Sequence, residues 1–446
     1  MNVSRREYAI AVVLLLAVSV SVRAQTPIAL TIDEAVARAL AGRARVAEAA
    51  AREAAASAAV AGRAALRQPA LSVSSGVLRT NHVEEFGVPQ AGGTTRIIFP
   101  DLPNNYRARA ELAVPLYTAG RVDALVRAAE ADRRAAAADR RTVEADIALE
   151  ARRAYWALVL ARETVGVLDR ALARTDAAVA AVGARVDVGL LPPNDRLAAQ
   201  AQRARQNVRL IQARHEAALA EAQLARAMGA DPGQSITTST PDTEPTAGAA
   251  ALAARPAQDL EGEARAKRPE RLALEDRRSA FEEAAAAVSA AFRPQIAALA
   301  AIEPARPNPR FVPRVDEWNT AWDLGVHVTW TLWDGGRARA ERGATLAQAD
   351  ALGHRLTDFD AAVAVEVRQR LLDRASAEAA LAACAEGVAA ATENQRVVEE
   401  RFAAGVADST DVLDAEIALL EAELECTRLA AAVRLAEAAL LRVVGQ

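Results

Sequence analysis

The sequence is poor in aromatic residues, cysteine, methionine and lysine. Aromatic residues make up 4% of the 446 positions, there are two cysteines and two methionines, and Lys267 is the only lysine. The 54 basic residues are balanced by 58 acidic ones, so no positive excess points to nucleic acid as a partner. Alanine, the strongest helix former, fills roughly a quarter of the positions. The composition therefore predicts long helices in close backbone contact rather than a mixed globular core.

Long apolar runs are also missing after the N-terminal segment. Residues 1–24 begin with two arginines, continue with an apolar stretch and end in Val22-Arg23-Ala24, which predicts a secretory signal peptide. The rest of the chain has no apolar stretch of about 18 residues, the length that a transmembrane helix needs. If the mature protein crosses a membrane, it must therefore do so with strands.

The groups that perform enzymatic chemistry or hold metals are scarce. The four histidines are scattered over different predicted elements without ligand spacing, and no serine, cysteine and histidine arrangement suggests a nucleophile. The segment from Asp334 to Arg337 resembles a phosphate-binding loop only superficially, because it lacks the lysine and the serine or threonine. We expect no catalytic residue, no metal site and no cofactor, and predict that the protein is not an enzyme.

An internal repeat organises the chain. Residues 114–229 align without a gap on residues 330–445 at a constant shift of 216. The glycines carry this alignment, because each stands where a helical pattern begins or ends. A shift of this size is too long for a solenoid and indicates a duplicated domain. The aligned glycines are Gly120 with Gly336, Gly189 with Gly405, and Gly229 with Gly445.

Each half has the same predicted order of elements: helix, two strands, long helix, turn and helix. The first repeat covers 25–229, with strands at 70–79 and 106–117. The second repeat covers 263–446, with strands at 295–303 and 322–333. A linker or equatorial segment rich in proline and glycine, at 230–262, joins the two repeats.

The helices are predicted from their start and stop signals. A capping box of Thr31 and Glu34 predicts one helix from Ile32 to about Leu66. The helical patterns that follow Gly120 and Gly336 are so long that each helix would extend for roughly 100 Å. Helices of this length must pack along their sides, as in a coiled coil.

Two stretches alternate strictly between apolar and polar residues over ten or eleven positions, the length of a tilted membrane-spanning strand. They contain or adjoin four of the five tryptophans and two of the four tyrosines, as expected of a girdle at the membrane interface. The other interpretation is a soluble hairpin that packs its tryptophans on a helix. Four strands with a lipid-facing side leave two open edges, so an oligomer is required, and three chains would supply twelve strands. The candidate girdle residues are Tyr106, Tyr117, Trp318, Trp322, Trp330 and Trp333.

The ordered set of motifs resembles the TolC-like outer-membrane efflux protein family. The signal peptide, the tandem repeats, the segments Leu116–Arg121 and Leu332–Arg337, and the segment Phe402–Gly405 followed by Asp411–Ala415 carry the resemblance. The resemblance implies a mostly α fold with a membrane β-barrel: long coiled-coil helices form a trimeric α-barrel, and four strands per chain contribute to a twelve-stranded β-barrel. It also implies a location in the outer membrane that extends into the periplasm.

The function that the resemblance implies is a passive exit duct of a tripartite efflux pump or a type I secretion system. Its partners would be a periplasmic adaptor (membrane fusion protein), an inner-membrane pump and outer-membrane lipid. The exposed turns at the hairpin tips, at Gly189 and Leu190 and at Gly405 and Val406, would dock the adaptor. The alternative from another class is a soluble periplasmic coiled-coil scaffold or adaptor, which has no need of alternating strands.

The resemblance also assigns residues to a gate. Asp411 and Asp414 resemble an acidic ring at the pore constriction, while Asp195 and Phe402 resemble members of the contacts that close it. A ring of carboxylates in a narrow lumen would attract cations. The other interpretation is a helix N-terminal acid followed by a solvated surface charge. Ala407 stands where the resemblance implies a gate arginine, so the closed state here would need other contacts.

The two cysteines stand at equal distances from a predicted turn. Cys384 precedes Gly405 by 21 residues and Cys426 follows it by 21, so both would lie at about the same height in an antiparallel hairpin. An oxidising periplasm would allow a disulfide between the two helices. The other interpretation is two small buried thiols, because helix axes about 8 to 10 Å apart require both side chains to point into the seam.

Overall fold

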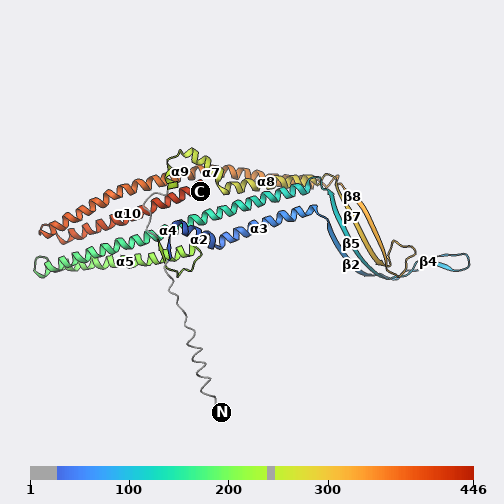
Figure 1. Ribbon diagram of the computed structural model, residues 1–446, viewed down its shortest axis with the longest axis horizontal. Coiled ribbons are helices and arrows are strands. Elements are labelled where there is room, and N and C mark those ends of the chain that lie inside the picture. The colour runs from blue at the N-terminus through green and yellow to red at the C-terminus, as the bar shows by residue number, and fades with distance from the viewer. Residues whose placement is uncertain (1–27, 239–246, 446) are drawn as a thin grey trace, which may run out of the picture. The chain divides into compact units, whose positions relative to one another are not determined.

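The computed structural model describes residues 28–238 and 247–445, so the predicted signal peptide lies outside the described residues. The chain is dominated by helices, and the four longest of its described strands form one sheet (Figure 1). In chain order the elements are β1 (Ile28–Leu30), α2 (Ile32–Gly42), α3 (Ala44–Ala64), a 3₁₀ turn (Ala65–Arg67), β2 (Ala70–Arg79), β3 (Phe86–Pro89), β4 (Thr95–Phe99), β5 (Asn104–Tyr117), α4 (Arg121–Asp187), α5 (Pro193–Ala227), β6 (Ile236–Thr238), α6 (Ala247–Ala253), α7 (Ala257–Lys267), α8 (Pro269–Ala290), β7 (Gln295–Arg306), β8 (Asn319–Thr329), α9 (Arg337–Ala403) and α10 (Ser409–Val444).

The chain divides into two compact units, and each unit takes residues from both sequence repeats. Of the described residues, one unit takes 28–44, 146–238, 247–256 and 369–442. The other takes 45–145, 257–368 and 443–445. The first is called the hairpin unit below and the second the sheet unit. In residues 28–238 and 247–445, no helix combines the length and the apolar character needed to cross a membrane.

The hairpin unit contains two antiparallel helical hairpins. Within this unit α5 returns along α4, and arginines of α5 pair with acids of α4 along their length. α10 returns along α9 in the same way, and a disulfide links these two helices. The core between the hairpins contains Leu168 and Leu210 of the first hairpin and the fully buried Leu420 of α10. Close packing of small and medium apolar side chains therefore holds the hairpins together.

The sheet unit contains an antiparallel sheet with the strand order β2-β5-β7-β8. The two repeats meet in its middle, where β5 of the first repeat pairs with β7 of the second. One row of the register joins all four strands: Leu71 lies opposite Leu112, Leu112 opposite Ala300, and Ala300 opposite Leu324. Since residues two apart on a strand share a face, this row defines an apolar face of the sheet.

The apolar face is open to its surroundings, whereas the opposite face holds charged groups in cross-strand pairs. Six side chains of the apolar face have exposed fractions between 64% and 75%. On the other face, the Arg109 guanidinium lies 3.1 Å from a carboxylate oxygen of Glu303 and 3.3 Å from one of Asp323. The sheet therefore has the two-sided character predicted from the alternation. The six exposed side chains are Leu71, Val73, Val77, Leu324, Val326 and Val328.

The single helix predicted from Ile32 to Leu66 is wrong, because the chain breaks at Arg43 into α2 and α3. Arg43 adopts an extended backbone conformation, and its guanidinium bonds to the Glu150 carboxylate at 3.0 Å and to the carbonyl oxygen of Arg226 at 2.9 Å. A Cβ on the preceding Gly42 would lie 2.6 Å from the carbonyl oxygen of Met228. The chain therefore passes so close to α4 and α5 that tertiary contacts override the local helical preference.

Three further segments differ from the predicted elements. The strand predicted at 322–333 is β8, which begins at Asn319 and ends at Thr329; the Trp330 indole then donates to the carbonyl oxygen of Phe292 at 2.9 Å. The loop between β2 and β5 contains the β3 and β4 hairpin. The predicted linker contributes β6, which pairs in parallel with β1, and the helix α6.

Candidate functional site: the hairpin tips

Each hairpin tip is a glycine-terminated turn. Gly189 and Gly405 have φ angles of 77° and 76°, the left-handed conformation that glycine adopts without a steric penalty. The amide of the next residue donates back to the last helical turn: Leu190 to the carbonyl of Arg185 at 2.8 Å, and Val406 to that of Arg401 at 2.9 Å. This is the Schellman arrangement. It leaves the apolar side chains of Leu190 and Val406 at the tip, 73% and 68% exposed.

Two polar contacts join the tips of the two hairpins. The Ser409 hydroxyl donates to the Asp195 carboxylate at 2.8 Å. The Arg185 guanidinium donates to the carbonyl oxygen of Ala403 at 2.9 Å, and its carbon lies 4.0 Å from the centre of the Phe402 ring. Phe402 is buried against Val182 and Val412. Two of the predicted closing residues, Asp195 and Phe402, are thus in contact with the opposite hairpin, and Ala407 takes no part in these bonds.

The two aspartates assigned to the acidic ring lie together on α10. Asp411 and Asp414 line one shallow recess, whose other walls come from α9 and include Arg401. The Asp411 carboxylate accepts from the backbone amide of Asp408 at 3.1 Å, so it also caps the start of α10. A capping role and an electrostatic role for Asp411 are compatible, since the cap uses one carboxylate oxygen.

A buried polar cluster lies between the hairpins behind the tips. The hydroxyl of Thr175 on α4 lies 2.6 Å from Gln206 Oε1 on α5 and 2.9 Å from Glu416 Oε2 on α10. All three side chains are buried. Burial raises the pKa of Glu416, and nearby Glu399 adds to this effect, although the bond to Thr175 and the charge of Arg174 oppose it. The Thr175 hydroxyl has one proton and lies next to two acceptor oxygens, so it can donate to only one of them. A protonated Glu416 would donate to the hydroxyl and thereby satisfy both contacts.

Replacing Glu416 with glutamine should remove one source of pH-dependent stability. Because the pKa of Glu416 is raised in the folded protein, this residue favours folding most at acid pH, where its carboxyl group is neutral. As the pH rises through that pKa, the folded protein must hold a buried negative charge, so this contribution to its stability is lost. Glutamine is neutral throughout, so the melting temperature of Glu416→Gln should exceed that of the wild type increasingly toward alkaline pH. Circular dichroism melts at a series of pH values measure this difference. The exposed Glu421→Gln serves as the control and should follow the wild type.

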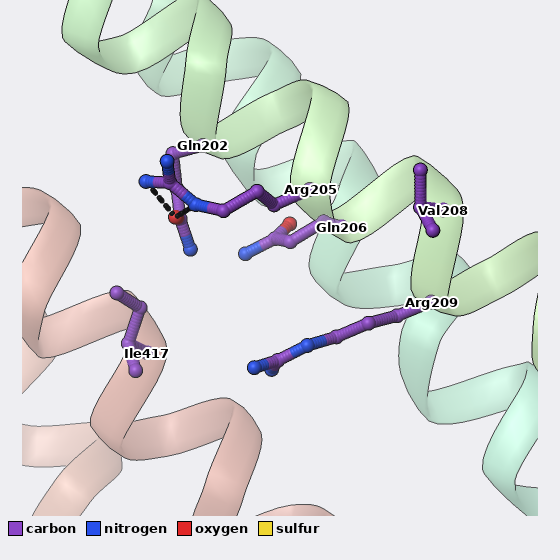
Figure 2. A pocket seen from close by; sticks show the side chains of 6 residues that line it. All are labelled: Gln202, Arg205, Gln206, Val208, Arg209 and Ile417. Atoms are coloured by element: carbon purple, nitrogen blue, oxygen red, sulfur yellow. Dashed lines mark hydrogen bonds between the residues drawn. The ribbon is translucent and has the colours of Figure 1, made fainter.

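A recess beside this cluster carries positive charge. Figure 2 shows Gln202, Arg205, Gln206, Val208 and Arg209 of α5 facing Ile417 of α10 across it. The Arg205 guanidinium donates to Gln202 Oε1 at 2.9 and 2.7 Å. Among the described residues that line this recess, none carries a carboxylate. The recess is open to solvent, and Arg205 and Arg209 make it a basic patch at the hairpin seam.

Cys384 and Cys426 form a disulfide between α9 and α10. Their Cα atoms are 5.6 Å apart, within the usual range for a bridge. Among the described residues there is no free cysteine. The predicted hairpin geometry, with both cysteines at one height, is the arrangement that the structure has.

Loss of this bridge should lower the stability of the second hairpin. The cysteines are 42 residues apart, and closing a loop of that size restricts the unfolded chain by about 4 kcal/mol in the chain-entropy treatment. We expect Cys384→Ser and the double serine variant to lose the same amount, because either change removes the whole bond. Denaturant unfolding followed by helical circular dichroism tests this. A double variant much less stable than the single one would contradict it.

The aromatic residues predicted to form the girdle are in different settings. Trp322 lies on the apolar face of β8, and Trp330 and Trp333 follow the end of that strand; all three are exposed. Tyr106 and Trp318 contact each other, with ring centres 6.3 Å apart. These residues are thus on or next to the sheet, as a girdle requires.

Sequence reasoning missed several residues of the seam. Arg185 and Ser409 were not singled out, although Arg185 aligns with Arg401 in the repeat and could have been noticed there. The buried trio of Thr175, Gln206 and Glu416 gave no signal, because such residues are common on solvated helical faces. Within residues 28–238 and 247–445, no group of three or more histidine, cysteine or acidic side chains is placed to hold a metal ion.

The comparisons with known proteins agree with this architecture. The family model described as "Outer membrane efflux protein" matches residues 35–230 and 260–446. The solved outer-membrane channel OprN is 21% identical, with 93% of this chain and 89% of that chain covered and a TM-score of 0.73. VceC of Vibrio cholerae is 18% identical, with 93% and 96% covered and a TM-score of 0.74. CusC is 17% identical, with 95% of each chain covered and a TM-score of 0.77. No curated protein matches the sequence.

The structural likenesses, all below 25% identity, show the fold. The family model covers most of the chain and shows the family. The chain belongs to the outer membrane efflux protein family, whose members are outer-membrane efflux channels of tripartite pumps.

Proposed function

We propose that three copies of this chain form a passive exit duct across the outer membrane. The observation that carries the proposal is the open sheet: β2 and β8 each have one unpaired edge, and the apolar face is exposed. Unpaired backbone groups are not tolerated in lipid, so these edges must pair with other copies. Three copies close the sheet with twelve strands, an even number within the known range.

The duct works with a periplasmic adaptor and an inner-membrane pump. The exposed Leu190 and Val406 beside the tip glycines support docking of the adaptor at the tips, since apolar groups in exposed turns suit a partner helical hairpin. The duct supplies no energy, and docking opens it. The arrangement of duct, adaptor and inner-membrane pump is the same for an efflux pump and for a type I secretion system.

The gate lies at the same tips. Asp411 and Asp414 of three copies form an acidic ring, and the Asp195 and Phe402 contacts hold the two hairpins of each chain together at the tip. The aromatic residues near the sheet form the girdle at the membrane interface. The two sequence repeats, 25–229 and 263–446, are joined by the segment 230–262, and each contributes to both compact units.

Fractionation of the cell envelope tests the proposal. The protein should be found in the outer membrane and migrate as a trimer on an unheated gel and as a monomer after heating. A monomer in the soluble periplasmic fraction would overturn the duct and favour the scaffold. Planar-bilayer recordings of the purified trimer should then show channel conductance.

A further inference from the structure

The two helical hairpins are equivalent position by position. α4 and α9 each have 67 residues, and their bounds coincide at the 216-residue shift. α5 and α10 begin at Pro193 and Ser409, which differ by the same shift. The disulfide obeys this equivalence as well, because Cys384 and Cys426 occupy the positions of Leu168 and Leu210, which are buried together in the first hairpin.

This equivalence determines how neighbouring copies would meet in the proposed trimer, on which the inference rests. A ring of three chains has six hairpins in which first and second hairpins alternate. If the six hairpins are evenly spaced around the ring, one geometric relation holds for both kinds of neighbours. The second hairpin of one copy then packs against the first hairpin of the next copy in the same way as the first hairpin packs against the second within a chain. Each contact seen within the chain therefore has a counterpart between copies, found by shifting the residue numbers by 216.

Five polar contacts between described residues cross the seam within the chain. They are formed between side chains or between a side chain and a carbonyl, at 2.7 to 2.9 Å. All five lie in the hairpin unit, and two of them lie at the tips. The pairs are Arg174 with Glu423, Thr175 with Glu416, Arg185 with the carbonyl of Ala403, Asp195 with Ser409, and Arg442 with Asp146.

Four of the five contacts are lost between copies, because in each counterpart one polar partner becomes an alanine or a proline. The shift replaces the two ion pairs with an alanine beside an asparagine and an alanine beside an arginine. It replaces the buried bond with an alanine and a glutamine, and the carboxylate–hydroxyl bond with an aspartate and a proline. Packing is reduced too, because the position of the fully buried Leu420 becomes Ala204. The replacing pairs are Ala390 with Asn207, Ala362 with Arg226, Ala391 with Gln200, and Asp411 with Pro193.

The fifth contact is retained and gains a charge. Arg185 corresponds to Arg401, and Ala403 corresponds to Asp187, so the arginine again meets a main-chain carbonyl, which now belongs to an aspartate with a carboxylate beside it. No salt bridge of Arg401 is found among the described residues, and the Asp187 side chain is 69% exposed although it contacts Arg196. Both partners are therefore accessible to a second copy. We propose that Arg401 of one copy binds the Asp187 carboxylate of the next copy and is the main polar latch of the seam between copies.

The difference between the two seams determines where the tip opens. The seam within the chain has five polar contacts and a leucine core, whereas the seam between copies has one ion pair and an alanine at the position of Leu420. Adaptor docking therefore separates neighbouring copies and leaves the two hairpins of each chain together. The latch also accounts for closure of the gate with Ala407 in place of an arginine. Arg401, in the last turn of α9, supplies the cation instead.

Cysteine cross-linking tests the latch directly. Arg401→Cys combined with Asp187→Cys should give covalent dimers and trimers on a heated, non-reducing gel. The matched pair Arg185→Cys with Ala403→Cys should cross-link within one chain and remain at monomer mass. A trimer on the unheated gel without covalent oligomers from the first pair would overturn the latch alone. A monomer on the unheated gel would overturn the trimer, and the latch with it.

Conductance provides a second measurement that does not depend on new cysteines. Arg401→Gln should raise the resting conductance in planar bilayers at least about twofold, and Arg401→Lys should restore part of the closed state. Arg185→Gln is the control and should have a smaller effect, because four other contacts hold its seam. Unchanged conductance in Arg401→Gln, or a larger effect in Arg185→Gln, would overturn the proposal.

Discussion

Replacing Asp411 and Asp414 with asparagine should reduce the cation preference of the channel about tenfold, the lower end of the effect that a charged passage has on local ion concentration. Three copies would present six carboxylates around one narrow passage, and their summed potential attracts cations and repels anions. Asparagine keeps the side-chain shape, and its oxygen can still accept from the Asp408 amide that Asp411 binds. The change therefore removes charge while preserving the helix cap. Reversal potentials across a salt gradient in planar bilayers measure the preference.

A matched control separates the ring from the general acidity of the tip. Asp408 is an aspartate in the same turn, but it does not line the recess that Asp411 and Asp414 share. Asp408→Asn should leave the reversal potential close to that of the wild type. If the double variant kept the wild-type conductance and cation preference, Asp411 and Asp414 would be a helix cap and a surface charge only.

Placing an arginine at Leu324 should prevent most of the protein from assembling in the outer membrane. Leu324 is the middle residue of the 11-residue β8 and is 74% exposed on the apolar face. An arginine on the lipid face near the bilayer midplane costs about 2–4 kcal/mol, and a trimer incurs this cost three times. The fraction of heat-sensitive trimer in the outer membrane, compared with total protein, measures the effect.

The control for this change is His327→Arg on the same strand. His327 belongs to the opposite, polar face, where a charged side chain remains in water. We expect this variant to assemble as well as the wild type. Equal loss of trimer in both variants would mean that the alternation of β8 does not separate a lipid face from a water-filled interior.

Local signals in the sequence were sufficient for the long helices and for the two-sided strands. α4 and α9 have the bounds expected from the glycines at Gly120 and Gly336 and from the turns at Gly189 and Gly405. These signals work because glycine in the left-handed conformation ends a helix wherever it stands in the fold. The strand alternation is equally local, since it reflects only which of two faces each side chain occupies.

The spacing of the cysteines around Gly405 placed both at one height, but whether they bond depended on the rotational phase of α9 and α10. The same limit applies to the tips: Arg185 contacts Ala403 and Ser409 contacts Asp195, although the partners are 218 and 214 residues apart in sequence. The break at Arg43 likewise follows from contacts with residues that are distant in the chain. The sequence by itself determined the type of the main elements, the lengths of α4 and α9, and the repeat symmetry, because these depend on neighbours along the chain. Only the tertiary structure decided which side chains meet across the hairpin seam, because helix rotation is set by packing against residues that the local pattern does not contain.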